Sequence, residues 1–265
     1  MADFRPIFPA HAIERCSVTV AFNSEVPEKA MKRIVADATP KVAGLGLQEG
    51  RQPIGFQVDA LSGKITPLEK GGPANFVSSD NRQQLALMPN AITWATQQYV
   101  RWGQFKSQFD KVASYAIEQY ETLVSISSVQ LEYWDRFIWT GDWDDFDVAQ
   151  LLKPSSPLIS PKAVAARKEW HSHIGWFEDA EHSRRLWNVN VDVVGLAEAT
   201  GVSRPSVGIY TMARDQMSAV RGQQDFFESK PVTSRLDLLH AELNEMFKGL
   251  ICSDMCRRIG LETGG

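Results

Sequence analysis

Two histidines separated by a single residue are the clearest candidates for chemistry in this chain. His171 and His173 lie in the segment EWHSHIGWFED, which runs from Glu169 to Asp179. Imidazole nitrogens bind zinc, and a carboxylate such as Glu169 or Asp192 could supply a third ligand. Asp192 could instead orient His171 as a general base. Metal binding and acid–base catalysis are therefore the two chemistries that this segment offers.

The pattern of apolar residues predicts that this segment is one strand of a β-hairpin. The partner strand spans Arg185–Val194. Because successive side chains of a strand point to opposite faces, the register decides which residues meet. A register that pairs Trp176 with Trp187 also pairs Ile174 with Val189 and Trp170 with Val193, which gives the hairpin one apolar face. A shift by one residue would set tryptophans against polar side chains, so we predict the first register.

Polar side chains gather on the other face of this hairpin, and a third strand extends that face. The candidate binding residues on it are His171, His173, Asn190, Asp192, Tyr210 and Arg214. Three interpretations stay open. The face is a solvated surface, on which His171 and Asp192 form an ordinary cross-strand pair. It is a recognition surface for a protein or a small ligand. Or it is a metal or acid–base site that uses His171, His173 and Asp192.

Charge, cysteine content and hydropathy narrow the classes of function. A net charge of −4 argues against general nucleic-acid binding, which usually needs a basic surface. The three cysteines, Cys16, Cys252 and Cys256, show no paired framework, which is typical of a reducing compartment. No apolar run approaches the ~18 residues of a membrane helix, and the first residues lack a signal-peptide core. We expect a cytoplasmic protein with no cofactor, no membrane association and no nucleic-acid partner.

Two long segments with the same apolar spacing predict two amphipathic helices. Their apolar residues recur at intervals of 3, 4, 3 and 4: Trp102, Phe105, Phe109, Val112 and Ala116 in one, and Leu236, Leu239, Leu243, Met246 and Leu250 in the other. A strand, a shorter helix and a strand meander precede each of them. We therefore predict an α+β fold of two related halves, 1–124 and 125–265, each an antiparallel sheet backed by its long helix, or one continuous domain of both.

Three segments resemble the landmarks of one bacterial family. They are HAIERCSVTVAF near the start, EYWDRFIW in the middle and LDLLHAELNEMFKGLI near the end. The family is sporadically distributed among bacteria, has no established function, and has members about as long as this 265-residue chain. In its middle landmark the family has an arginine, an aromatic residue and then Ile-Asn, where this chain has Tyr133, Trp134, Asp135 and Arg136. The resemblance therefore transfers no site residue, but its distribution implies an accessory gene, such as one of a phage defence or toxin–antitoxin module.

Together these features favour a non-enzymatic binding or regulatory protein that acts through protein contacts. Its partner would be another protein of such a module, or a second copy in a homodimer. The alternative is a small-molecule binder or a metal-dependent hydrolase with a pocket around His171, His173 and Asp192. An enclosed pocket at those residues, lined also by Tyr210, would favour the alternative, and a flat, open polar face would argue against it.

Overall fold

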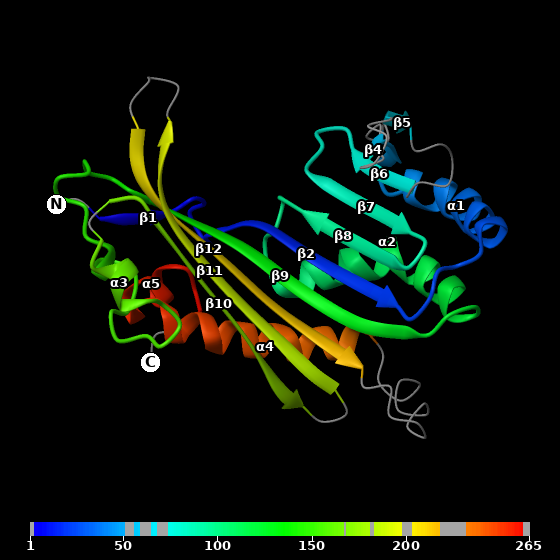
Figure 1. Ribbon diagram of the computed structural model, residues 1–265. Coiled ribbons are helices and arrows are strands. Elements are labelled where there is room, and N and C mark those ends of the chain that lie inside the picture. The colour runs from blue at the N-terminus through cyan, green and yellow to red at the C-terminus, as the bar shows by residue number, and fades with distance from the viewer. Residues whose placement is uncertain are drawn as a thin grey trace. The chain divides into compact units, whose positions relative to one another are not determined.

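The computed structural model describes residues 3–50, 56–58, 65–67, 74–166, 168–180, 183–197, 203–217 and 232–261. Its helices separate runs of consecutive strands along the chain (Figure 1). In order they are β1 (Phe4–Pro6), β2 (Ile13–Phe22), α1 (Glu28–Ala43), β3 (Leu47–Glu49), β4 (Phe56–Val58), β5 (Ile65–Pro67), β6 (Ala74–Ser78), β7 (Gln83–Met88), β8 (Ala91–Thr96), α2 (Trp102–Glu121), β9 (Ile126–Trp139), the 3-10 helix η1 (Val148–Gln150), α3 (Pro161–Val164), β10 (Trp170–Ala180), β11 (Ser183–Ala197), β12 (Ser203–Met217), α4 (Val232–Leu250) and α5 (Ser253–Arg258).

Ten of the strands belong to one antiparallel sheet. Its order is β10-β11-β12-β9-β2-β8-β7-β6-β3, with β1 paired to β9, and β4 pairs with β5 separately. The chain divides into two compact units. The first comprises Met1–Ser17, Gln97–Trp102 and Ser128–Gly265, and the second comprises Val18–Thr96 and Gly103–Ser127. Among the described helices, none is long and apolar enough to cross a membrane.

The predicted fold of two related halves, each backed by its own long helix, is wrong. The strands form one large antiparallel sheet, and those of the two parts of the chain differ in length. Strands β6 to β8 have five or six residues, whereas β9, β11 and β12 have 14 or 15. A 3, 4, 3, 4 spacing shows only that a helix has an apolar face, not which strands pair. The expected boundary at residues 124 and 125 falls within the Gly103–Ser127 segment of the second unit.

The second unit is a short-stranded meander with helices α1 and α2. Helix α1 begins after Pro27. Proline is preferred at the start of a helix, because its fixed φ suits the first turn. Asn81, with a φ of 57°, occupies the turn between β6 and β7, where asparagine tolerates the left-handed conformation well. The fully buried Tyr120 of α2 donates a hydrogen bond to the carbonyl of Met88 at 2.8 Å. That bond anchors α2 to the end of β7.

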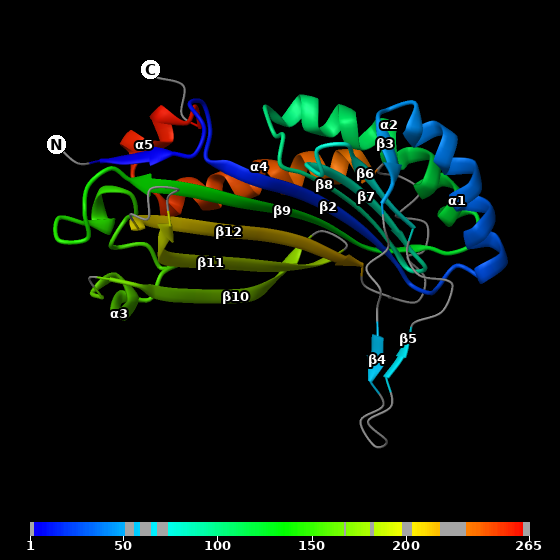
Figure 2. The same ribbon diagram turned by 90° about the horizontal axis from the view of Figure 1, so that it is seen from above.

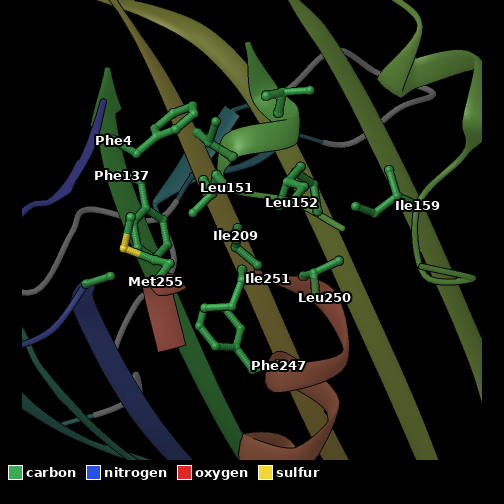
Figure 3. Close-up of a cluster of buried hydrophobic side chains, with 14 of the residues drawn as sticks. Phe4, Phe137, Leu151, Leu152, Ile159, Ile209, Phe247, Leu250, Ile251 and Met255 are labelled. Atoms are coloured by element: carbon green, nitrogen blue, oxygen red, sulfur yellow. The ribbon is translucent and has the colours of Figure 1, made fainter. Parts of the chain in front are cut away.

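The first unit is built on the long strands β9 to β12 (Figure 2). The predicted hairpin register is confirmed, because Trp176 lies opposite Trp187 and His173 lies opposite Asn190. One face of these strands is apolar and buried, and side chains of α4 and α5 pack against it. Figure 3 shows this core, in which Phe247 and Leu250 of α4 lie over Ile209 of β12.

A buried ion cluster fixes the other end of α4 to the same face of the sheet. Asp215 of β12, which is 0% exposed, accepts two hydrogen bonds from Arg185 of β11, at 2.6 and 3.0 Å. Arg235 of α4 donates to the same carboxylate at 2.8 Å. Arg185 also pairs with Glu242, which lies about two turns beyond Arg235 on α4. Bidentate arginine–carboxylate pairs are directional, so this cluster sets both the position and the rotation of the helix.

We predict that Asp215→Ala destabilises the protein by about 3–5 kcal/mol, because two arginines would be left buried without their carboxylate. Denaturant unfolding of the full chain measures this change. The matched control is Asp254→Ala, which removes a carboxylate paired with Arg257 at 3.2 Å on the surface of α5, where both side chains are more than half exposed. We expect little change there, since surface pairs contribute weakly. Equal losses in both variants would contradict the role of the cluster.

Candidate functional site: a buried carboxyl in a small cavity

A cavity of about 220 Å³ lies within the first unit, between its sheet and α4. Strand β9 contributes Tyr133 and Asp135 to its wall, and β12 contributes Thr211. Helix α4 contributes His240, Leu243, Asn244 and Phe247, and the remaining wall comes from His11–Ile13, Tyr99, Arg101, Trp102 and residues 259–261. Pockets for drug-sized ligands measure ~300–1,000 Å³, so this one suits a smaller molecule.

The most unusual residue in the wall is Asp135, a carboxyl on the buried face of β9. Its neighbours on that face include Leu131, Tyr133 and Phe137, and the residue itself is only 6% exposed. Within the described part of the chain, no hydrogen bond to its carboxyl is found. Burial raises the pKa of Asp135 from its ordinary value of 3.8 to about 8. At neutral pH the folded protein therefore holds a protonated carboxyl that faces the cavity.

A chain of hydrogen bonds leads from the cavity wall into α4. The hydroxyl of Tyr133 lies 2.8 Å from Nδ1 of His240, and the side-chain amide nitrogen of Asn244 lies 3.1 Å from Nε2 of the same ring. An amide N–H can only donate, so Nε2 accepts and Nδ1 carries the proton. Burial lowers the pKa of His240 to about 4. His240 is therefore neutral near pH 7 and donates to the Tyr133 hydroxyl.

Aromatic rings stack around this histidine. Trp102 stacks on His240 with 4.2 Å between ring centroids, and its indole N–H donates to Asp237 at 2.7 Å. Tyr99 meets Tyr133 edge to face at 6.0 Å, and His11 meets Tyr99 in the same manner at 5.7 Å. The side chains of the cavity are thereby locked in place by their neighbours, which gives the cavity a fixed shape.

The outer wall of the cavity holds a histidine and an arginine. Burial, together with the charge of Arg101, lowers the pKa of His11. Nδ1 of His11 is buried and has no hydrogen-bond partner among the residues described. Arg101 is exposed and donates long hydrogen bonds to the carbonyls of Ala10 and Val100, at 3.4 and 3.5 Å. The outer wall is thus positively charged, whereas the inner wall has a carboxyl.

The six residues predicted from the sequence lie on the opposite face of the sheet and not in this cavity. The strand register does place them side by side: His171 opposite Asp192, His173 opposite Asn190, and Asn190 opposite Tyr210. Arg214 follows on the same face, opposite Leu186. The side chains of His171 and His173 are exposed, and those of the other four are half-buried. Their surface is an open sheet face, which we call the polar face.

Asp192 on the polar face pairs with an arginine of a strand two positions away. Its carboxylate lies 3.2 Å from Arg136 of β9, although β12 runs between β9 and β11. Gly208 of β12 makes this pair possible, because a Cβ there would lie 2.5 Å from Asp192 and 2.8 Å from Arg136. The ionic partner of Asp192 is therefore Arg136, which weakens the interpretation in which Asp192 orients His171.

The metal interpretation finds no support from the geometry. In the described ranges, no group of three His, Cys, Asp or Glu side chains is placed to hold a metal ion. The three cysteines are all free thiols, and Cys16 and Cys256 are buried. Burial raises the pKa of the Cys16 thiol well above its ordinary value, so Cys16 stays neutral and is a poor nucleophile.

Comparison with the models of known protein families and with curated proteins yields no match to this chain.

The sequence pattern did not reveal the cavity residues, because their side chains lie on the strand face that the pattern assigns to the hydrophobic core. Tyr133 and Asp135 alternate with Trp134 and Arg136, and the sequence does show that Asp135 and Arg136 point to opposite faces. A carboxylate between Tyr133 and Phe137 on an apolar face was the available signal, since unpaired aspartates are almost never fully buried. His240 gave a weaker signal, because its partners come from a distant strand.

The raised pKa of Asp135 predicts a specific pH dependence of stability. The folded state keeps this proton up to about pH 8, whereas the unfolded chain loses it near 3.8, so the contribution of Asp135 to stability falls as pH rises between these values. Asp135→Asn is neutral throughout. We expect the unfolding free energy of the variant to exceed that of the parent by a margin that grows with pH, by up to about 1.4 kcal/mol per unit, and levels off above pH 8. Parallel curves from pH 4.5 to 8.5 would contradict the raised pKa.

Proposed function

We propose that the first unit binds a small polar molecule in the cavity between its sheet and α4, without catalysing a reaction on it. The observation that carries this proposal is Asp135, a carboxyl that is 6% exposed, lines the cavity and lacks a hydrogen bond from the described residues. Leaving such a group unpaired costs stability, and proteins usually retain that cost at sites of function. A bound ligand would supply the missing partner.

Binding fits the cavity better than catalysis does. The nitrogens of His240 are both engaged, one with Tyr133 and one with Asn244, so the ring is held as a structural donor. The nearby thiol of Cys16 is neutral and buried. Neither His240 nor Cys16 is therefore prepared to act as a base or a nucleophile.

The cavity proposal is tested with three four-carbon probes that differ only in their polar group: butylamine, 1-butanol and butyrate. We expect at least one probe to bind the full chain in ligand-observed NMR. Thr211→Met, which extends a side chain from β12 into the cavity, should weaken that binding by at least about tenfold.

The matched control is Tyr210→Phe. Residue 210 directly precedes residue 211 in β12 and lies on the polar face. If Thr211→Met does not fold, Leu243→Phe fills the cavity from α4. Binding that both cavity variants retain would overturn the proposal.

A second function, protein binding by the polar face, is favoured by a separate observation. Asn188, Asn190 and Arg214 are half-buried on this face. The same face carries Trp134 and Tyr210, whose rings are 5.0 Å apart. Aromatic side chains and an arginine beside polar side chains are typical of recognition surfaces. An open face with these side chains fits a non-enzymatic role in protein contacts, and a partner from a defence or toxin–antitoxin module stays a hypothesis.

Co-expression with the product of a neighbouring gene tests the second function. We expect the two proteins to elute together, and Tyr210→Ala to weaken the complex by at least about tenfold, since buried aromatic residues dominate interface energies. Thr211→Met is now the control, because residue 211 faces the cavity and should leave the complex intact. A complex that survives Tyr210→Ala but is lost with Thr211→Met would assign the contact to another surface.

A further inference from the structure

We infer that the molecule bound in the cavity is a small amine, whose ammonium group pairs with Asp135 at the inner end. This inference rests on the proposed binding function and adds the chemical class of the ligand. An ammonium group donates hydrogen bonds and carries a positive charge, and the Asp135 carboxyl lacks both kinds of partner in the described structure.

The charges of the wall favour a cation at the inner end. His240 is neutral, because burial lowers its pKa to about 4, and burial also lowers the pKa of His11. Arg101 is the one permanent cation among the residues described in the wall, and it lies exposed. Once Asp135 is ionised, an ammonium group is repelled from the outer wall and attracted to Asp135. A carboxylate ligand would face the ionised Asp135 as a like charge.

The surrounding rings favour the same class of ligand. Three aromatic residues, Tyr99, Trp102 and Tyr133, line the same cavity as Asp135. Aromatic faces attract an ammonium group, and the attraction is strongest where water is excluded. The hydroxyl of Tyr133 is held by the Nδ1–H of His240 and by hydrogen bonds with Cys16 and Tyr99. A neutral alcohol would gain the hydrogen bonds but not the ionic or aromatic attraction.

The size of the cavity limits the amine. Its volume of about 220 Å³ lies below the ~300–1,000 Å³ of pockets for drug-sized ligands. A short alkylamine or amino alcohol is of a size that this volume accommodates. Thr211 and Phe247 bound the cavity from β12 and α4, and both are almost fully buried.

Binding of an ammonium group should be linked to the proton of Asp135. The titratable groups that face this carboxyl are Cys16 of β2, Tyr133 of β9, Tyr99 before α2 and His240 of α4, with His11 and Arg101 further out. The thiol and both phenols keep their protons up to high pH, because burial raises their pKa. His240 changes charge only near pH 4. Between pH 6 and 8, Asp135 is thus the group whose ionisation controls the affinity for a cation.

The experiment is isothermal titration of the full chain with butylamine and with 1-butanol, in phosphate buffer from pH 6 to 8.5. We expect butylamine to bind about ten- to hundredfold more tightly than 1-butanol at pH 8, the preference typical of a hydrogen-bonded charge. Its affinity should rise by up to about tenfold per pH unit up to pH 8, because the competent form of the site is ionised. The affinity for 1-butanol should change little.

The decisive variant is Asp135→Asn, with Asp192→Asn on the polar face as its matched control. Asp135→Asn keeps the shape of the side chain, so we expect it to abolish both the preference for butylamine and the pH dependence while 1-butanol still binds. Asp192→Asn should leave all three unchanged. Near-ultraviolet circular dichroism checks that both variants are folded.

The outcomes separate this inference from the function on which it rests. If 1-butanol or butyrate binds and responds to Thr211→Met, but butylamine has no advantage, the ammonium inference is overturned and the binding function stands. If none of the three probes binds at millimolar concentration, both are overturned. A preference for butylamine that Asp135→Asn leaves intact would also overturn the assignment to Asp135.

Discussion

The bond network around Asp215 is the interaction on which the first unit depends. This carboxylate, with no exposed surface, is shared by Arg185 of β11 and Arg235 of α4, and it holds the helix at one end. The apolar contacts of Phe247 and Leu250 hold the other end. Hydrophobic packing alone would let a helix slide along a sheet, because apolar contact is non-directional. The ion cluster removes that freedom, and the cavity exists because α4 is fixed over β9 and β12.

Asp215 and Asp135 show two outcomes for a carboxyl buried on the same sheet face. Asp215 is surrounded by two guanidinium groups that donate three hydrogen bonds, so its charge is compensated within the fold. Asp135 has the phenols of Tyr99 and Tyr133 and the thiol of Cys16 nearby, none of which carries a positive charge, and burial raises its pKa to about 8. The first carboxyl is ionised and organises the structure, whereas the second is kept neutral by burial at neutral pH.

The long strands of the first unit thereby support two different surfaces. Alternation sends Tyr133 and Asp135 towards α4, and sends Trp134 and Arg136 to the polar face. On the polar face, Arg136 of β9 forms an ion pair with Asp192 of β11 across the intervening strand β12. Gly208 of β12 permits this pair, because a side chain at that position would separate the two residues. The two faces are thus built from alternating residues of β9 and β12.

The sequence by itself determined the local features of this protein: the register of β10 with β11, the polar face that collects His171, His173 and Asp192, and the apolar stripes of α2 and α4. Each follows from a period of 2 or 3.6 residues that is written along one segment. Only the tertiary structure decided that the strands join in one sheet instead of two helix-backed halves, and that Asp135, His240 and Trp102 meet. These residues come from three segments, and their meeting depends on long-range pairing and on arginine–carboxylate geometry, which no local period encodes.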